Sequence, residues 1–261
     1  MAEKQRLDIA LYERGLAPSR EKARAMIMAG EVSVDGHRVD KPGTRVSLAN
    51  ELTVKSKPRF VSRGGEKLAG ALADFHFDVT GKICADVGAS TGGFTDCLVQ
   101  YGAARVYAID VGYGQLDYEL RQNPRVITIE RTNARYIEKL TEPVNLVVID
   151  ASFISLKILL PPIKGWLTPQ ADVIALIKPQ FEAGKKEVGK GGVVKDSAIH
   201  ARVIEEILTF AQEQGFSVRG LTTSPLKGPA GNVEFLVWLG WGYSGETTPI
   251  ATLIEQVFSQ E

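Results

Sequence analysis

The sequence contains few of the residues that form disulfide frameworks, metal centres or membrane anchors. Cys84 and Cys97 are the only cysteines among 261 residues, and the three histidines are scattered along the chain. We therefore expect no disulfide framework and no metal site. The N-terminus lacks the apolar core of a signal peptide, and no apolar run approaches the length of a membrane span. These absences predict a cytoplasmic protein that does not act at a membrane.

Charge is balanced overall but unevenly distributed. The chain has no formal net charge at pH 7, yet residues 1–67 hold 14 Lys and Arg against 9 Asp and Glu, a net charge of +5. The remainder holds 17 Lys and Arg against 22 Asp and Glu, a net charge of −5. The basic N-terminal portion is therefore a candidate surface for binding a polyanion.

What the sequence does contain is a glycine-rich turn between an apolar strand and a helix. The turn spans residues 85–94 and reads Ala-Asp-Val-Gly-Ala-Ser-Thr-Gly-Gly-Phe. Residues 82–87 have the pattern of a short buried strand, and residues 94–101 carry apolar side chains at helical spacing. Glycines at such a turn let the backbone approach a ligand closely, and the helix N-terminus supplies unpaired N–H groups. The turn predicts a site for a nucleotide-type cofactor.

A second acidic residue indicates which cofactor the turn holds. Residues 105–110 form another apolar strand that ends in Asp110, where a carboxylate can accept hydrogen bonds from both hydroxyls of an adenosine ribose. The turn has the spacing Asp-x-Gly-x-x-x-Gly-Gly, which suits S-adenosylmethionine better than a dinucleotide, because no pyrophosphate has to be cradled. Asp86 is expected near the amino-acid end of that cofactor. The alternative is a plain α/β turn with solubilising acids.

The pattern after residue 62 predicts strands that alternate with helices. A helix is expected through residue 75 and a long one near 196–214. The expected strands are 83–87, 105–110, 126–130, 145–150, 172–177, 217–223 and 233–239. The last two strands follow each other closely, which predicts an antiparallel hairpin at one edge. The fold class is therefore α/β, a seven-stranded, mostly parallel sheet of the kind known from Rossmann-like methyltransferases.

The first 55 residues have a separate pattern, typical of a small α+β domain. Gly15 can end a first short helix, Ser19 can cap a second one, and Gly30 can end it. Residues 31–39 alternate like a strand that turns at Asp-Gly and returns. Residues 56–61 are polar and contain a proline, so we predict a linker there and a second domain over residues 62–261.

A set of positions in the first domain forms a motif that spans nearly the whole segment: Arg6-Leu7-Asp8, Gly15-Leu16, Ser19-Arg20, Ala23, Ile27, Gly30, Val32, Val34, Gly36, Val39 and Lys41-Pro42. These positions resemble the alpha-L RNA-binding motif of a small-subunit ribosomal protein and of pseudouridine synthases. A short helix with Arg20 and Arg24 on one face suits phosphates across an RNA groove. We expect RNA contacts from Arg6, Arg20, Arg24, Arg59 and Arg63. The alternative is a basic helix that is only solvated.

Four polar residues stand where a catalytic site would need them. Lys67 lies on the helix before the first strand of the second domain, and Glu234 opens the last strand. Asp150 and Lys178 end the fourth and fifth strands. The carboxyl ends of parallel strands line the ligand crevice of an open α/β sheet, so these two should lie beside the cofactor.

The order of these four residues resembles the K-D-K-E tetrad of FtsJ-type ribose 2'-O-methyltransferases. Together with segments 62–68, 110–116, 131–135 and 178–182, they make the whole chain similar to the TlyA-type (haemolysin A) family of rRNA methyltransferases. The resemblance implies S-adenosylmethionine-dependent 2'-O-methylation of ribosomal RNA at cytidine, with ribosomal RNA or ribosomal subunits as partners. The cofactor-binding residues expected from the turn and the resemblance are Asp86, Gly88, Ala89, Ser90, Gly92, Gly93, Phe94, Asp110, Val111, Asn133 and Asp150.

The chemistry of such a transfer needs an activated hydroxyl. An alcohol is a poor nucleophile until it loses its proton, so Lys178 is a candidate base, or the lysines stabilise the developing alkoxide. Asp150 is followed by Ala-Ser-Phe rather than the Pro-Pro-aromatic of amino-group methyltransferases, and neither cysteine suits a carbon-5 mechanism. Two further features are candidates for contacts with RNA. The aromatics Phe153, Trp166 and Phe181 are candidate base-stacking groups, with core packing as the alternative. The Gly- and Lys-rich loop 184–192 is a candidate RNA contact, with a mobile surface loop as the alternative.

Two further functions compete with this one. The historical name of the family suggests a membrane-lytic haemolysin, which no spanning segment in the sequence supports. An RNA-binding assembly factor with a vestigial cofactor pocket is the other, and the intact turn and tetrad argue against it.

Overall fold

The computed structural model describes residues 4–55, 58–244 and 248–259. The chain divides into two compact units, Met1–Pro58 and Arg59–Glu261. The first two residues of the expected linker, 56 and 57, lie outside the described residues. Residues 59–61, also expected in the linker, belong to the second unit, because Phe60 is buried in its core and the Val61 N–H donates to Asp96 Oδ2 at 2.8 Å.

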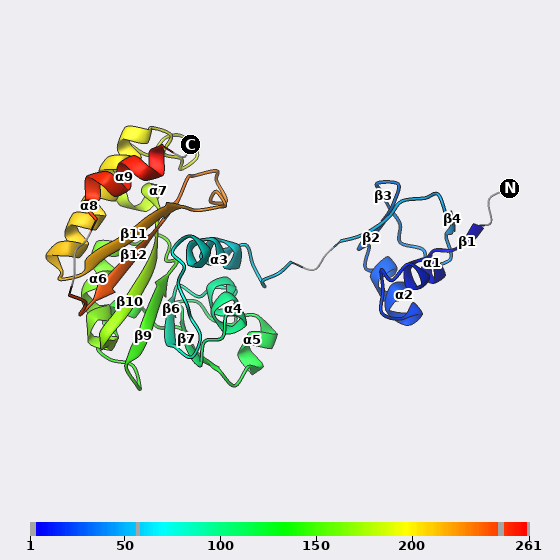
Figure 1. The fold of residues 1–261 in the computed structure, drawn as a ribbon, viewed down its shortest axis with the longest axis horizontal. Helices are drawn as coiled ribbons and strands as arrows, with labels where there is room; N and C mark the ends of the chain where they lie inside the picture. Colours follow the sequence, from blue (N-terminus) through cyan, green and yellow to red (C-terminus); the bar gives the residue numbers. More distant parts are fainter. Residues whose placement is uncertain (1–3, 56–57, 245–247, 260–261) are drawn as a thin grey trace. The chain divides into compact units, whose positions relative to one another are not determined.

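The first unit is a small α+β structure (Figure 1). Its elements are β1 (Lys4–Arg6), α1 (Leu7–Glu13), α2 (Arg20–Met28), β2 (Val32–Val34), β3 (His37–Arg38), β4 (Arg45–Ser47) and β5 (Leu52–Val54). Strand β1 pairs antiparallel with β4, and β2 pairs antiparallel with β3 and β5. The Ser19 hydroxyl caps α2 by accepting from the Lys22 N–H, as the sequence predicts. The apolar sides of both helices close over the strands through Leu7, Leu11, Ile27 and Val46.

The second unit is built on one seven-stranded sheet, in the order β11-β12-β10-β9-β6-β7-β8. The strands are β6 (Ile83–Val87), β7 (Arg105–Ile109), β8 (Val126–Ile129), β9 (Val144–Ile149), β10 (Leu167–Ile177), β11 (Ser217–Thr223) and β12 (Phe235–Trp241). Strands β6 to β10 run parallel to one another, and β12 runs antiparallel between β10 and β11. The predicted fold class, a mostly parallel seven-stranded sheet with an antiparallel hairpin at one edge, is therefore confirmed.

Two strands differ from their expected bounds by more than one residue. Strand β10 begins at Leu167, five residues before the predicted start, although its regular pairing with β9 begins only at Asp172. Strand β12 begins at Phe235 rather than at residue 233, because residues 224–234 form a loop that closes where the Ser224 N–H donates to the Glu234 carbonyl. This loop leaves Glu234 just outside the sheet.

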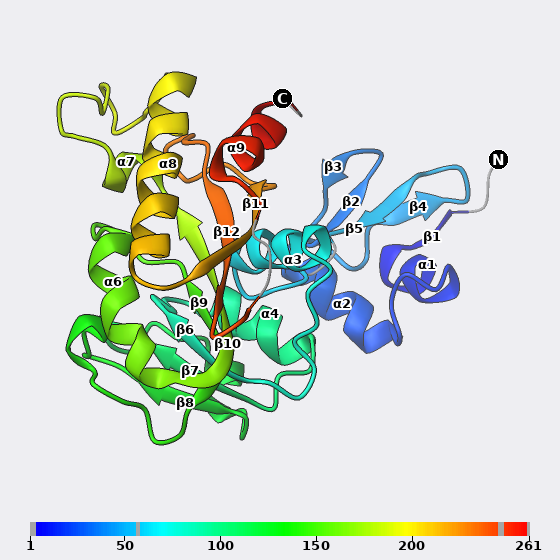
Figure 2. The ribbon, with the colours of Figure 1, turned by 60° about the vertical axis from the view of Figure 1, so that its left-hand side comes forward.

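Helices cover both faces of the sheet (Figure 2). They are α3 (Gly64–Asp74), α4 (Gly93–Gln100), α5 (Tyr118–Gln122), α6 (Leu156–Ile163), α7 (Pro179–Glu182), α8 (Ser197–Glu213), α9 (Ile250–Phe258) and the 3-10 turns η1 (Ala134–Tyr136) and η2 (Lys164–Trp166). Side chains of α6, α8 and α9 pack on one face, and those of α3, α4 and α5 pack on the other. Alternate residues of each buried strand face the two helix layers. Because β6 to β10 run parallel, the polar residues that follow these strands meet at one edge of the sheet.

Candidate active site

Two adjoining cavities open at the carboxyl edge of the parallel strands. One, of about 390 Å³, is lined by all four tetrad residues together with Arg63, Phe94 and Lys227. The other, of about 660 Å³, is lined by Asp110, Val111 and Asn133 and by the aromatics Phe153 and Phe181. Gly88, Ser90, Asp150 and Ser152 line both cavities. A ligand that fills the larger cavity would therefore lie next to the smaller one and beside Asp150, the tetrad residue that the two cavities share.

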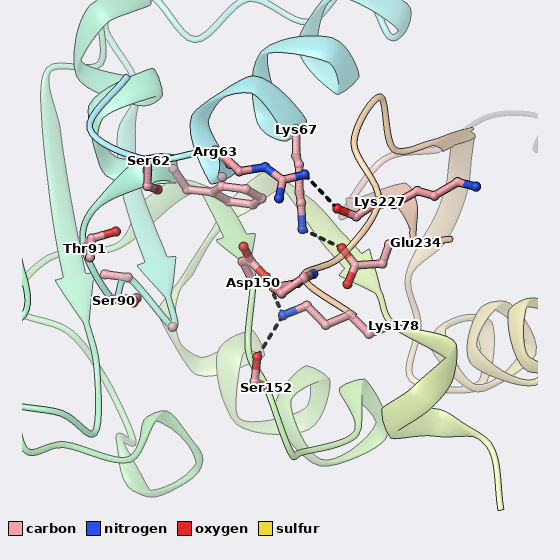
Figure 3. A pocket seen from close by; sticks show the side chains of 16 residues that line it. Ser62, Arg63, Lys67, Ser90, Thr91, Asp150, Ser152, Lys178, Lys227 and Glu234 are labelled. Atoms are coloured by element: carbon pink, nitrogen blue, oxygen red, sulfur yellow. Dashed lines mark hydrogen bonds and ion pairs between the residues drawn. The ribbon is translucent and has the colours of Figure 1, made fainter. Parts of the chain in front are cut away.

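The tetrad forms two lysine–carboxylate pairs (Figure 3). Lys67, from α3, places Nζ 2.5 Å from Glu234 Oε2, and Lys178, which follows β10, places Nζ 2.6 Å from Asp150 Oδ1. Lys67, Lys178 and Glu234 are buried, and each charge has a partner, as buried charges require. The sequence predicts that the four side chains converge, but it does not predict which lysine pairs with which acid.

Further polar groups, which the sequence analysis did not predict, complete these pairs. Lys178 Nζ also donates to Ser152 Oγ at 3.0 Å, and Gln180 Nε2 donates to Glu234 Oε1 at 3.3 Å. Each lies two residues after a tetrad member, Ser152 beyond the end of β9 and Gln180 on α7, so their nearness in the sequence to the tetrad was the signal for finding them. Arg63 Nη2 donates to the Lys227 carbonyl at 3.1 Å, which holds the loop after β11 against the start of α3.

The glycine-rich turn brings backbone close to the tetrad. Gly88 has φ of +86°, and a Cβ there would lie 2.8 Å from the Asp150 carbonyl oxygen. At Gly93 a Cβ would lie 2.9 Å from the Gly65 backbone nitrogen, so this glycine lets α4 and α3 approach. A side chain at Gly88 would displace Asp150, and one at Gly93 would displace the helix that carries Lys67.

Asp110 is held with both carboxylate oxygens occupied by backbone donors. The Ser90 N–H donates to Oδ2 at 2.8 Å, and the Gly112 N–H donates to Oδ1 at 2.7 Å. These contacts join the glycine-rich turn to the end of β7 and fix the carboxylate at the wall of the larger cavity. The second lone pair of each oxygen remains for a ligand, and these two acceptors suit the two hydroxyl donors of an adenosine ribose.

The expected cofactor residues divide into two groups. Gly88, Ala89, Ser90, Gly93, Phe94, Asp110, Val111, Asn133 and Asp150 line one cavity or both. Asp86 and Gly92 line neither. Gly92, at φ +98°, instead makes room for Leu120, since a Cβ there would lie 2.4 Å from Leu120 Cδ1.

Asp86, expected near the amino-acid end of the cofactor, is buried and lines neither cavity. Its side chain is fully buried, and Thr95 Oγ1 donates to Oδ2 at 2.6 Å. Its Oδ1 atom has no hydrogen-bond partner among the residues that the structure describes. Burial raises the pKa of Asp86 to about 7 against the opposing Thr95 hydrogen bond, and the nearby Asp150 charge adds to the rise.

The arginines expected to bind RNA have different surroundings. Arg63 lines the tetrad cavity, whereas Arg59 Nη2 donates to the Tyr101 hydroxyl at 3.0 Å outside both cavities. In the first unit, Arg6 and Arg20 both bind the buried carboxylate of Asp8. Arg24 is exposed on α2.

The aromatic and cysteine residues fall into exposed and buried sets. Phe153 is 89% exposed at φ +64°, and its ring centroid lies 4.8 Å from that of Phe181 at the mouth of the larger cavity. Trp166 is a core residue, and its indole N–H donates to the Ile137 carbonyl. Burial raises the pKa of the Cys84 thiol to about 12 and also raises that of Cys97, so neither thiol is a nucleophile here.

The Gly- and Lys-rich loop lies outside both cavities but is anchored beside the tetrad. Asn232, two residues before Glu234, donates from Nδ2 to the Gly192 carbonyl at 2.9 Å. Its Oδ1 accepts from the Val194 N–H at 3.0 Å. The loop therefore leaves the sheet shortly after Lys178 and is bound again close to Glu234.

Comparison with known proteins agrees with this geometry. The model of the FtsJ-like methyltransferase family matches residues 60–241, and that of the S4 domain matches residues 5–52. The 16S/23S rRNA (cytidine-2'-O)-methyltransferase TlyA of Mycobacterium tuberculosis is 50% identical over 92% of this chain and 91% of its own. Hemolysin A of Brachyspira hyodysenteriae is 41% identical over 88% of this chain and 98% of its own. A Streptococcus thermophilus structure described as a hemolysin superposes with a TM-score of 0.74 at 44% identity, over 100% of this chain and 98% of its own.

The Rossmann-like sheet, the glycine-rich turn and the tetrad define a methyltransferase. The chain belongs to the FtsJ-like methyltransferase family, in the TlyA (haemolysin A) group, and carries an N-terminal S4 domain. Within the described part of the chain, no helix combines the length and the apolar character needed to cross a membrane.

Proposed function

We propose that this enzyme transfers a methyl group from S-adenosylmethionine to the 2'-hydroxyl of a cytidine in ribosomal RNA, in the cytoplasm. The observation that carries the proposal is that two lysine–carboxylate pairs, of which Lys67–Glu234 is buried, adjoin a cavity whose Asp110 suits an adenosine ribose. The similarity to the M. tuberculosis 16S/23S rRNA (cytidine-2'-O)-methyltransferase TlyA supports the acceptor and the nucleotide.

The residues of the larger cavity fit the proposed cofactor. Asp110 would hold the ribose hydroxyls, and Val111 and Asn133 would lie along the adenine. Gly88 lets the glycine-rich turn pack against the Asp150 backbone, and both residues line the two cavities, so the reactive end of the cofactor would lie beside the tetrad. When bound, S-adenosylmethionine supplies a methyl group on a positively charged sulfur, open to attack by an oxygen.

The tetrad activates and aligns the hydroxyl. Asp150 and Ser152 hold Lys178 Nζ from two sides at 2.6 and 3.0 Å, so its position at the cavity wall is fixed. Lys178 as a neutral amine would accept the hydroxyl proton as the oxygen attacks, and Asp150 would hold the ammonium that results. The Lys67–Glu234 pair would hold the ribose in line, and the oriented Lys67 cation would lower the cost of the negative charge that develops on the oxygen.

Recognition of the RNA rests on both units. Arg6, Arg20 and Arg24 of the S4 domain would contact phosphates, with Arg59 and Arg63 of the second unit. The exposed ring of Phe153, backed by Phe181, would stack on the base of the target nucleotide.

Methyl transfer to unmethylated ribosomal subunits tests the proposal. Labelled S-adenosylmethionine is supplied with each subunit separately, and the product is mapped by primer extension sensitive to ribose methylation. Wild type and the control Lys157→Ala, whose lysine pairs with Glu206 outside both cavities, should yield a 2'-O mark on a cytidine. Lys178→Ala should yield none. A mark on a base atom, or no transfer to either subunit despite cofactor binding, would refute the proposed acceptor.

A further inference from the structure

A buried carboxylate lies beneath the basic surface of the S4 domain. Asp8, the second residue of α1, is fully buried. Its Oδ1 accepts from Arg6 Nε at 2.9 Å, and its Oδ2 accepts from Arg6 Nη2 at 3.2 Å and from Arg20 Nε at 3.1 Å. Two guanidinium groups, one from β1 and one from the first turn of α2, therefore meet on one oxygen atom.

The carboxylate leaves part of each guanidinium available to a ligand. The side chains of Arg6 and Arg20 are 39% and 54% exposed, and Asp8 uses only one edge of Arg6 and the Nε of Arg20. The Arg6 guanidinium also lies beside Gly43, where an added Cβ would be 3.3 Å from Nη1, so a glycine at this position leaves room for it. The remaining N–H donors belong to two groups whose orientation is set before any ligand arrives.

Other arginines of this unit are used differently. Arg14 donates to the Ser47, Leu48 and Asn50 carbonyls, so its guanidinium clamps a turn of the backbone. Arg38 and Arg45 each donate to one backbone carbonyl. Among residues 4–55, Arg6 and Arg20 are the arginines that a side-chain carboxylate organises.

The charge state of Asp8 agrees with this arrangement. Burial acts to raise the pKa of Asp8, but the hydrogen bonds from Arg6 and Arg20 together outweigh it and lower the pKa below its ordinary value. The carboxylate is therefore ionised at neutral pH, and the cluster of two cations and one anion keeps a net positive charge for a phosphate.

We propose that Asp8 is a positioning residue that holds Arg6 and Arg20 together as one fork for an RNA phosphate. The inference rests on the proposed function, in which the S4 domain docks ribosomal RNA. Asp8 is buried and does not itself touch the RNA. Removing a negative charge ordinarily strengthens binding to a polyanion. Here Asp8→Asn should weaken it, because two flexible arginines must then be ordered at the moment of binding.

The test measures binding of the full-length protein to the ribosomal subunit that accepts methyl groups. Asp8→Asn should raise Kd about tenfold and reduce the slope of log K against log salt by roughly one phosphate contact. The matched control is Asp40→Asn, which removes the same charge from an exposed position of the same unit and should leave Kd unchanged or lower it. In an Arg6→Ala/Arg20→Ala background, Asp8→Asn should change Kd by less than threefold, because its effect passes through those two side chains. A purely structural role would weaken binding equally in both backgrounds and would overturn the proposal.

Arg20→Lys gives a test that does not require replacing a buried residue. Lysine keeps the charge but cannot present a planar fork, so Kd should rise nearly as far as for Arg20→Ala. Wild-type affinity in Arg20→Lys would overturn the fork. If wild type binds no subunit, or if Arg6→Ala/Arg20→Ala binds as wild type does, the RNA docking in the proposed function fails. If that double variant binds weakly while Asp8→Asn binds normally, only the inference about Asp8 fails.

Discussion

The Nζ atom of Lys178 lies 2.6 Å from Oδ1 of Asp150, and this pair joins the ends of two neighbouring parallel strands, β10 and β9. The strands pair with Ala175 opposite Ile149, and the same register continued past their ends puts Lys178 opposite Ser152. Lys178 Nζ contacts Ser152 as well, at 3.0 Å. The position of this amine is therefore set by backbone register and not by its side chain alone.

Replacement of Lys178 distinguishes two roles for its side chain, that of a proton acceptor and that of a fixed positive charge. Lys178→Ala should lower kcat by about 10² to 10⁴-fold, the usual contribution of a positioned acid or base. Lys178→Arg keeps the positive charge but cannot accept a proton near neutral pH, so it should be nearly as slow. Both variants should bind S-adenosylmethionine with wild-type affinity by calorimetry. Substantial activity in Lys178→Arg would show that charge stabilisation, rather than proton removal, is what the lysine supplies.

Gly88→Ala, which adds one methyl group, should lower the affinity for S-adenosylmethionine strongly. Alanine at φ +86° costs about 1–2 kcal/mol in any such position. At Gly88 its Cβ would also lie 2.8 Å from the Asp150 carbonyl oxygen, so the cofactor turn and Asp150 must move apart. We expect at least a tenfold loss of affinity for S-adenosylmethionine. Gly81→Ala is the control, because Gly81 has φ +72° with no atom within 4 Å of the added Cβ. It should lose similar stability and keep cofactor affinity, and equal affinities in the two variants would contradict the prediction.

Much of this site could be predicted from local pattern. Asp110 and Asp150 follow apolar runs that form β7 and β9, and Gly88 falls at a strand-to-helix turn, so short segments contain the information that places them. The pairing of Lys67 with Glu234 joins residues 167 positions apart through a loop whose closure depends on packing. Sequence alone does not show that these two side chains lie close together in space.

The burial of Asp86 follows from strand alternation along β6. Along β6, Ala85 and Val87 face the α6 and α8 side of the sheet, and Cys84 faces the α3 and α4 side. Strand alternation puts Asp86 on the same side as Cys84, under α4, where Thr95 meets it. The glycine-rich turn suggested a cofactor ligand, whereas the two-residue period indicated the core.

We predict that the buried Lys67–Glu234 pair is required for activity but adds nothing to the free energy of unfolding compared with two apolar side chains. Glu234→Leu leaves the Lys67 ammonium buried without its carboxylate and should lower the free energy of unfolding by ~3–5 kcal/mol. The double variant Lys67→Met/Glu234→Leu should recover most of that loss, because two apolar side chains replace two charges, and it should remain inactive. Urea unfolding followed by tryptophan fluorescence reports on the second unit alone, since Trp166, Trp238 and Trp241 all lie there. A double variant less stable than Glu234→Leu would contradict the prediction.

Asp86→Asn should make the second unit less sensitive to pH. The folded-state pKa of Asp86, about 7, lies above the ordinary value of 3.8, so the folded protein keeps a proton that the unfolded chain releases between these values. The contribution of this carboxyl to stability is therefore intact below about pH 4 and is lost as the pH rises toward 7. The asparagine variant pays a constant cost for its buried amide, which does not change with pH. Relative to the variant, wild type should lose about 2–3 kcal/mol of unfolding free energy between pH 5 and pH 8, measured by urea unfolding with tryptophan fluorescence. Parallel pH profiles for the two proteins would mean that Asp86 is ionised in the folded state throughout this range, with Oδ1 stabilised by a contact other than a proton.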